Sequence, residues 1–280
     1  MPELPEVETV VRDLRDHGLE KARILSADIR WPRIIEGMSP SSFARALRGR
    51  TITRLSRRGK YIVVSLDDGQ HLLIHLRMTG KLHYIPAKHD PGKHDQVVIT
   101  MVDGHQLLFN DTRKFGRLRL TRDADKGLGH LGPEPLEDTF TVSVLQQQLQ
   151  GKSRMIKPLL LDQNCVAGLG NIYVDEALWQ AKIHPERHAN TLTKAEMKKL
   201  HQAIRTVLQQ GVENCGTTLG TGQTNFYSVA GRRGHNADAL KVFRRTGEPC
   251  PRCSTPIVRT VVGQRGTHFC PTCQRPLSAY

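Results

Sequence analysis

The chain has 280 residues, 38% of them hydrophobic and 24% charged, a length that suggests two domains with a small appendage. The longest uninterrupted apolar run, at 61–64, is far shorter than the ~20 residues that span a bilayer. The first twenty residues contain no apolar stretch like that of a secretory signal peptide. These features exclude a membrane-spanning or mainly disordered chain and predict an intracellular protein.

The charge balance gives the first indication of a partner. Lysine and arginine number 41 against 27 aspartates and glutamates, which leaves a formal net charge of +14. Such an excess favours a polyanion such as nucleic acid, because neutralising phosphates releases condensed counterions. A device for solubility, or binding to a ribosome or a membrane surface, would give the same composition.

The first half of the chain predicts one helix followed by short strands. Residues 2–17 are expected to be helical, because Val7, Val10, Val11 and Leu14 recur at helical spacing and prolines occupy only the first turn. β-rich segments joined by short turns then suggest an antiparallel sandwich. The predicted strands are 51–56, 61–66, 70–76, 97–102, 106–109 and 116–121.

The second half changes to helical periodicity. Residues 127–140 hold several glycines and prolines and indicate a linker. The predicted helices after it are 144–149, 155–161, 172–183 and 193–210. A loop rich in glycine, threonine and asparagine follows at about 216–236.

The C-terminal region carries a metal-binding pattern. Four of the six cysteines form two pairs separated by sixteen residues, Cys250 with Cys253 and Cys270 with Cys273. This spacing is typical of a tetrahedral zinc site with four thiolate ligands, whereas disulfides fit an intracellular chain poorly. Residues 256–262 and 266–269 are expected to form two strands of a ribbon, with Arg265 near their turn. Cys165 and Cys215 are interpreted as small apolar fillers.

The opening Met1-Pro2-Glu3 offers a possible nucleophile. Removal of Met1 would leave a proline secondary amine, and an α-amino group titrates near ~8 against ~10.4 for lysine. A secondary amine that attacks the anomeric carbon of a sugar gives an iminium, the Schiff-base form of covalent catalysis, with Glu3 as an acid–base candidate. Position alone is also explained by a helix-starting proline and by glutamates that complement the helix dipole.

Several motifs together resemble the bacterial formamidopyrimidine-DNA glycosylase family, in order and over essentially the whole chain. They are Pro2-Glu3-Leu4-Pro5-Glu6, Arg58-Gly59-Lys60-Tyr61, His75-Leu76-Arg77-Met78-Thr79-Gly80, Lys93-His94-Asp95, Asp111-Thr112-Arg113-Lys114-Phe115-Gly116, Gly168-Leu169-Gly170-Asn171-Ile172-Tyr173 and the tail from Gly247 through Cys273. The related endonuclease VIII family typically has glycine where this chain has Leu4. The opening therefore favours the first family.

The resemblance implies roles for four catalytic candidates. Pro2 matches the nucleophile, and Glu3 matches the carboxylate that assists ring opening and proton transfer. Lys60 matches a lysine that contacts phosphate near the lesion; a solvated cation in its basic run is the alternative. Arg265 matches the zinc-finger arginine tied to the second elimination.

It also implies DNA contacts. Met78, Arg113 and Phe115 match the residues that fill the gap left by an extruded base; for Met78 and Phe115, ordinary core packing is the alternative. The remaining matches are His94 and Lys152 as DNA contacts, and Lys157 and Asn171 as phosphate contacts of a helix–two-turns–helix element. A plain glycine turn between helices would explain that last element equally well.

Three positions depart from the family pattern. Arg77 replaces the usual glycine before Met78, and Thr112 replaces the usual proline before Arg113. The loop at 220–234 lacks the common stretch ending in Gly-Tyr-Phe. In the family this loop closes over the extruded base, so lesion preference is the property most affected.

The sequence therefore predicts an α+β protein with three parts. These are a catalytic N-terminal helix and antiparallel β-sandwich at 2–128, a helical domain with the helix–two-turns–helix element and lesion loop at 129–236, and a zinc ribbon at 237–280. The family implies a monomeric DNA glycosylase and abasic-site lyase of base excision repair, acting on oxidised purines in duplex DNA through a Pro2 Schiff base. One structural zinc and a cytoplasmic, nucleoid-associated location are expected. The alternatives are an endonuclease VIII-like enzyme for oxidised pyrimidines and a non-catalytic zinc-ribbon DNA-binding protein.

Overall fold

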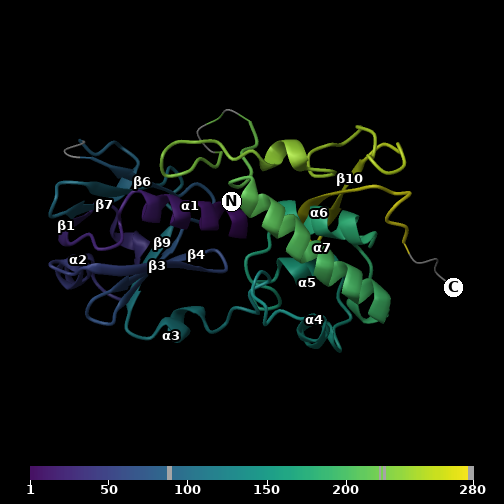
Figure 1. Cartoon of the computed structure of the whole chain (residues 1–280), viewed down its shortest axis with the longest axis horizontal. Helices are drawn as coiled ribbons and strands as arrows, with labels where there is room; N and C mark the ends of the chain where they lie inside the picture. The colour runs from purple at the N-terminus through teal and green to yellow at the C-terminus, as the bar shows by residue number, and fades with distance from the viewer. Residues whose placement is uncertain (87–89, 221, 223–224, 277–280) are drawn as a thin grey trace. The chain divides into compact units, whose positions relative to one another are not determined.

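The computed structural model describes residues 1–86, 90–220, 222 and 225–276. The chain divides into two compact units (Figure 1). Unit 1 comprises Met1–Gly129 with Asn214–His235, and unit 2 comprises His130–Glu213 with Asn236–Tyr280.

Unit 1 is a β-sandwich with a helix at its beginning, α1 (Leu4–Asp16). One sheet has the order β1 (Ile24–Ile29), β7 (Asp95–Met101), β8 (Gln106–Asn110) and β6 (Lys81–Ile85). The other has the order β2 (Ile35–Glu36), β9 (Arg117–Thr121), β5 (His71–His75), β4 (Tyr61–Leu66) and β3 (Ile52–Arg58). The named pairs are antiparallel, as predicted, except that the two-residue strand β2 pairs with β9 in parallel.

One apolar core joins the two sheets and α1. It contains Val97 and Phe109 from the first sheet and Ile62 and Leu118 from the second. The predicted face of α1 (Val7, Val10, Val11 and Leu14) is buried in the same cluster. The helical spacing of these apolar residues gives α1 one apolar face, and that face packs in the sandwich core.

Unit 2 contains helices and a two-stranded ribbon. The helices are α4 (Val142–Leu149), α5 (Ile156–Leu161), α6 (Asn171–Ala181) and α7 (Lys194–Glu213), and the ribbon pairs β10 (Val258–Val262) with β11 (Arg265–Phe269). Trp179 of α6 packs in a cluster with Cys250, Ile257 and Cys270, so the ribbon has its own apolar contact with the helices.

The sequence analysis did not predict some of the elements. They are α2 (Pro40–Leu47), α3 (Ala124–Leu128), the strands β1, β2 and β6, and the 3-10 turns η1 (Pro32–Ile34), η2 (Ala189–Thr191) and η3 (Asn236–Ala239). The segment 214–235, which we predicted as part of the helical domain, groups with unit 1. The reason is that it bonds to α1 and packs Val229 into the sandwich core. Within the described residues, no helix is both long and apolar enough to cross a membrane.

Candidate active site and metal centre

The N-terminus is built into the start of α1. Glu3 is the N-cap residue and is buried, while Pro2 before it is half-buried. Glu6, in the first turn, accepts the backbone N–H of Glu3 through Oε2 at 2.8 Å. This bond occupies one of the donors that a helix start leaves unpaired, so the residue next to Pro2 is held in place by its own helix.

The charges around the amino terminus come from both acids and bases. Burial lowers the pKa of the Met1 amino group below its usual value; Glu3 and Glu6 oppose this shift, and Lys60 and Arg113 reinforce it. A lowered pKa means that more of the amine is uncharged and nucleophilic at neutral pH. The charges of Glu3, Glu6, Lys60 and Arg113 thus all act on the amino terminus.

Lys60 occupies the tight turn between β3 and β4. Arg58 and Tyr61 pair across this hairpin, which leaves Gly59 and Lys60 as its two-residue loop. Gly59 has φ 55°, in the left-handed region that favours glycine. The Lys60 side chain is buried, so it is not the solvated cation that its basic run alone would suggest.

Met78 and Phe115 are exposed, not core residues, with exposed fractions of 39% and 46%. The Arg113 guanidinium lies over the Phe115 ring, 4.6 Å from its centroid. Arg77, where the family's usual residue is glycine, adopts a left-handed backbone with φ 53°. Two loops therefore present the three predicted gap-filling side chains at the surface.

A buried carboxylate that we did not predict holds both loops. Asp111 accepts the Thr79 hydroxyl and, at 3.1 Å, the N–H of Arg113 through Oδ1. Its Oδ2 accepts the N–H of Gly116 at 2.7 Å. Asp111 begins the motif Asp111–Gly116, yet only the three residues that donate to its carboxylate reveal this role.

His75 is a second residue whose role the sequence did not disclose. It is buried beside Tyr61, and its Nδ1 accepts the N–H of Arg77 at 3.0 Å. Burial, followed by the charges of Arg77 and Lys60, lowers the pKa of His75 to about 3. His75 is therefore a neutral acceptor that fixes the start of the Met78 loop.

The predicted DNA contacts His94 and Lys152 lie at element ends. His94 is half-buried just before β7, and its carbonyl accepts the N–H of Asp111 at 2.8 Å. Lys152 is half-buried in the turn after α4. Neither side chain is locked inside the core.

Lys157, which we predicted as a phosphate contact, is fully buried in this structure. Its side chain is 0% exposed, and its ammonium donates to Asp175 at 2.6 Å and to the Gly266 carbonyl at 3.1 Å. Asn171 donates to the same carbonyl at 2.9 Å. Both residues thus hold the ribbon strand at the position next to the exposed Arg265, and a direct phosphate contact by Lys157 would require opening a buried ion pair.

A glutamine side chain holds the turn between α5 and α6 through hydrogen bonds. Gln163 Oε1 accepts the N–H of Gly168 at 3.0 Å, and its amide donates to the carbonyls of Leu161 and Leu169. Gly168 has φ 84°. The glycine loop is therefore an internally bonded turn.

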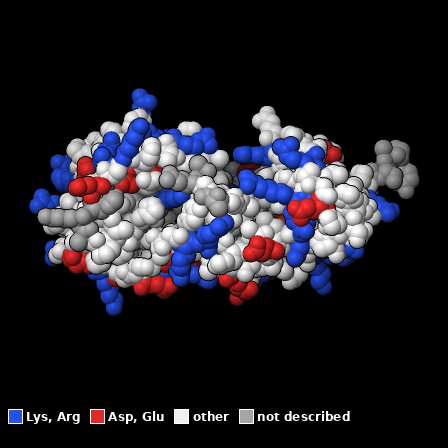
Figure 2. All heavy atoms as spheres, turned by 90° about the horizontal axis from the view of Figure 1, so that it is seen from above, with Lys and Arg blue, Asp and Glu red and all other residues white. Residues whose placement is uncertain are grey.

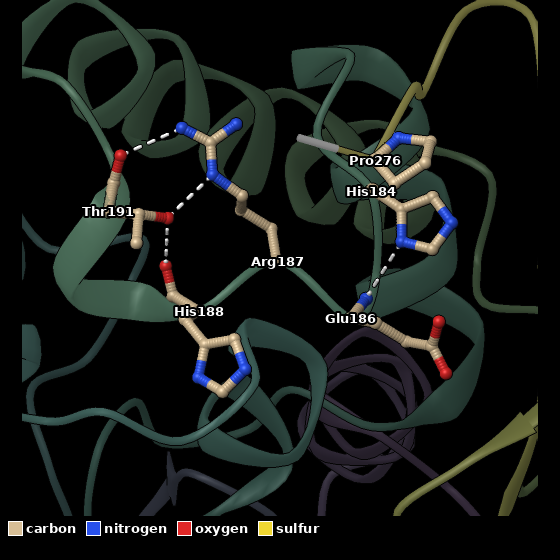
Figure 3. Close-up of a pocket in the computed structure, with 6 residues that line it drawn as sticks. All are labelled: His184, Glu186, Arg187, His188, Thr191 and Pro276. Carbon is tan, nitrogen blue, oxygen red and sulfur yellow. Dashed lines mark hydrogen bonds between the residues drawn. The ribbon is translucent and has the colours of Figure 1, made fainter. Parts of the chain in front are cut away.

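A small pocket of about 160 Å³ also lies in unit 2 (Figure 3). Arg187 donates to the Thr191 hydroxyl and carbonyl, and the Glu186 N–H donates to His184 Nδ1. These polar groups bond to one another, so they hold the chain after α6 in its conformation.

The four predicted cysteines converge. The sulfur atoms of Cys250, Cys253, Cys270 and Cys273 all lie within 4.8 Å of one another. Zinc–sulfur bonds of about 2.3 Å in a tetrahedron place sulfurs at such separations. Hydrogen bonds from Thr255 lower the pKa of Cys253 to about 6, whereas burial and neighbouring thiols raise that of Cys273 to about 12. Four clustered thiols share protons unequally, and a dication would hold all of them as thiolates. By contrast, Cys165 is buried as predicted, and Cys215 is exposed, not an apolar filler.

Comparisons with known proteins cover nearly the whole chain. Models of the formamidopyrimidine-DNA glycosylase N-terminal domain, the formamidopyrimidine-DNA glycosylase H2TH domain and the zinc finger found in FPG and IleRS match residues 1–118, 131–223 and 247–276. Formamidopyrimidine-DNA glycosylases from Enterococcus faecalis and Protochlamydia amoebophila are 48% and 43% identical to it; each alignment covers 98% of this chain and 98% or 100% of the relative. The chain belongs to the formamidopyrimidine-DNA glycosylase family.

Solved structures of this family agree with the fold. A mutant of the Lactococcus lactis protein in complex with DNA containing Fapy-dG has a TM-score of 0.90 at 38% identity, over 98% of this chain and 100% of that one. The Thermus thermophilus MutM protein has a TM-score of 0.87 at 39% identity, over 98% of each chain. The family's zinc finger and the converging sulfurs together make the cysteine cluster a single structural zinc site.

Proposed function

We propose that this chain is a bifunctional DNA glycosylase and abasic-site lyase that removes oxidised purines, such as 8-oxoguanine and formamidopyrimidines, from duplex DNA. The observation that carries the proposal is the N-terminal arrangement of Pro2 and Glu3 with Lys60 and Arg113, in a chain matching this family from end to end. Relatives include a Lactococcus lactis protein solved with DNA containing an abasic site.

The proposed reaction begins at Pro2 after Met1 is removed. The proline nitrogen attacks the anomeric carbon, the bond from that carbon to the base breaks, and the base leaves with a proton. The sugar ring then opens to an iminium linked to Pro2. Glu3, anchored by the bond from its N–H to Glu6, is positioned to transfer protons during base loss and ring opening.

Elimination follows from the iminium. Loss of a proton from the carbon next to it expels the 3′ phosphate, and a second elimination expels the 5′ phosphate, which leaves a one-nucleotide gap. We assign Lys60 and Arg265 to these phosphates because both are cations, one in a tight turn and one exposed on the ribbon. Met78, Arg113 and Phe115 would occupy the space left by the extruded nucleotide, which their exposure permits.

Zinc has no chemical step in this scheme. Four thiolates close a tetrahedral coordination sphere and leave no position for a reacting water. Bound zinc would hold the ends of the β10–β11 hairpin that carries Arg265.

The surface charge fits a DNA substrate. Lysine and arginine side chains extend over the face shown in Figure 2 and exceed the acidic ones there, in keeping with the net charge of +14. We propose a monomer that acts in the bacterial cytoplasm and associates with the nucleoid through DNA.

An excision panel tests the proposed substrate. Duplexes carrying 8-oxoguanine, a formamidopyrimidine or thymine glycol would be incubated with wild-type protein and with a Pro2→Gly variant. We expect cleavage of both purine lesions by the wild type and none by the variant. Cleavage confined to thymine glycol would replace our proposal with the endonuclease VIII-like alternative, and binding without cleavage would favour the non-catalytic one.

A further inference from the structure

The segment 214–235 is fastened to the helix that carries the proposed nucleophile. Two carboxylates of α1, Glu6 and Asp13, receive bonds from this segment. They are seven residues apart, so they lie on the same side of the helix about 10 Å from each other along its axis. In Figure 1 the yellow-green trace after α7 passes beside α1.

The first attachment reaches the catalytic residues. Glu6 Oε1 accepts the N–H of Thr217 at 2.7 Å, while its Oε2 accepts the N–H of Glu3. A Cβ at Gly216 would lie 3.0 Å from both Glu6 Cγ and the Phe226 ring, and φ there is 81°. One buried carboxylate therefore joins Glu3 to the beginning of this loop, and Phe226 packs against the same place.

The second attachment is an ion pair. Arg232 donates to Asp13 Oδ1 at 2.6 Å, and the Asp13 side chain is 4% exposed against 67% for Arg232. Among the described residues, the other oxygen of Asp13 has no hydrogen-bond partner. The buried carboxylate thus depends on this one arginine from the loop.

Hydrogen bonds through Thr218 hold the beginning of the loop to its later residues. The Thr218 hydroxyl donates to the Phe226 carbonyl at 2.7 Å and accepts the N–H of Gly234 at 2.8 Å. Ser228 and Arg232 form a turn through the Ser228 N–H and the Arg232 carbonyl at 2.9 Å. Because of this closure, a tether at Arg232 also acts on the residues at the start of the loop.

We propose that Asp13 and Arg232 are a positioning pair that holds this loop against α1 for base excision. The inference rests on the proposed function. A base leaving the anomeric carbon attacked by Pro2 departs beside Glu3, and the loop begins within two hydrogen bonds of Glu3. The ion pair holds the loop against α1 while the base is present. Cleavage at a site that has already lost its base does not require the loop to be held there.

The test separates base removal from strand cleavage. Arg232→Gln and Asp13→Asn would be measured under single turnover on an 8-oxoguanine duplex and on the same duplex with a preformed abasic site. A charge-assisted bond to a buried carboxylate supports about a tenfold loss of base excision in each variant, with abasic-site cleavage changed less than twofold. Arg232→Lys should recover part of the loss, and the double variant should be no worse than either single one.

A control on the same helix isolates the tether from a change of charge. Arg12→Gln removes an exposed arginine of α1 whose ion pair is with its own neighbour Glu8, and it should leave both activities unchanged. Equal losses on the two substrates, or no loss on either, would overturn the positioning role. Failure of the wild type on both substrates would overturn the proposed function itself.

Discussion

At the scale of single residues, the site depends on buried acceptors that hold its loops. Glu6, His75 and Asp111 each accept backbone N–H groups from a loop of the proposed site. The sequence predicted the exposed and charged members through their motifs. It did not predict these acceptors' partners. Glu6 and Asp111 bind Thr217 and Thr79 from segments that only the fold brings near, and the short-range bond from Arg77 to His75 depends on the conformation of the loop.

His75 gives the site a defined acid sensitivity. Its pKa is lowered from 6.5 to about 3, so the unfolded chain binds a proton that the folded one refuses between those pH values. Stability should therefore fall as pH drops from about 6.5 toward 3, with a slope of up to about 1.4 kcal/mol per pH unit from this residue.

His75→Asn keeps an acceptor for Arg77 and removes the titration. Urea unfolding of wild type and variant at pH 6.5 and 4.5 measures the difference. We expect the wild type to lose about 2 kcal/mol more than the variant over this interval. Parallel losses in the two proteins would contradict the neutral, buried state of His75.

At the scale of elements, periodicity predicted most of the fold. The strands at 61–66, 106–109 and 116–121 and the helix at 144–149 agree with β4, β8, β9 and α4 to within two residues. The signals for two missed elements were present. Ser39 caps α2 ahead of Pro40, and Leu82 and Tyr84 alternate inward along β6.

What periodicity could not give is the attachment of loops. The segment 214–235 follows a helix in sequence yet belongs to the sandwich, because Glu6 and Asp13 bind it across more than 200 residues. Carboxylates in a helix are ordinarily interpreted as solvent-facing, so burial had to be seen for their role to emerge.

Asp111 links two elements of the site. Asp111→Ala would remove the acceptor for Thr79, Arg113 and Gly116 and leave buried donors unpaired. We expect a loss of about 2 kcal/mol in unfolding free energy and weaker binding of a lesion duplex. Asp103→Ala, at an exposed hairpin turn of the same sandwich, is the control and should change stability by about 0.5 kcal/mol or less. Equal effects in the two variants would contradict the role of Asp111 in holding the two loops.

A Lys157→Met variant tests whether the Lys157 ammonium stabilises the fold or binds DNA. Removing one partner of its buried ion pair with Asp175 in Lys157→Met should cost about 3 kcal/mol of stability. Adding Asp175→Leu should restore part of that cost. The contrary result, a stable variant whose DNA binding loses about one unit of salt dependence, would return Lys157 to the phosphate contact we predicted.

At the scale of the whole molecule, two features bear on DNA binding: the positive net charge and the zinc site. The sequence predicted both, since composition and cysteine spacing need no knowledge of the fold. If the proposed contacts Lys60, Lys152 and Arg265 each neutralise a phosphate, log affinity for duplex DNA should fall against log salt with a slope of about −3 or steeper. A flat profile between 50 and 200 mM salt, at about neutral pH, would contradict the electrostatic part of the account.

The most direct test of the central claim is borohydride trapping on duplex DNA with one 8-oxoguanine opposite cytosine. Reduction converts the proposed iminium to a stable amine, and mass analysis of peptides then locates the linkage. Our account predicts a covalent adduct at Pro2, on protein that lacks Met1. An adduct at a lysine, or none on zinc-loaded protein whose Met1 has been removed, would contradict it.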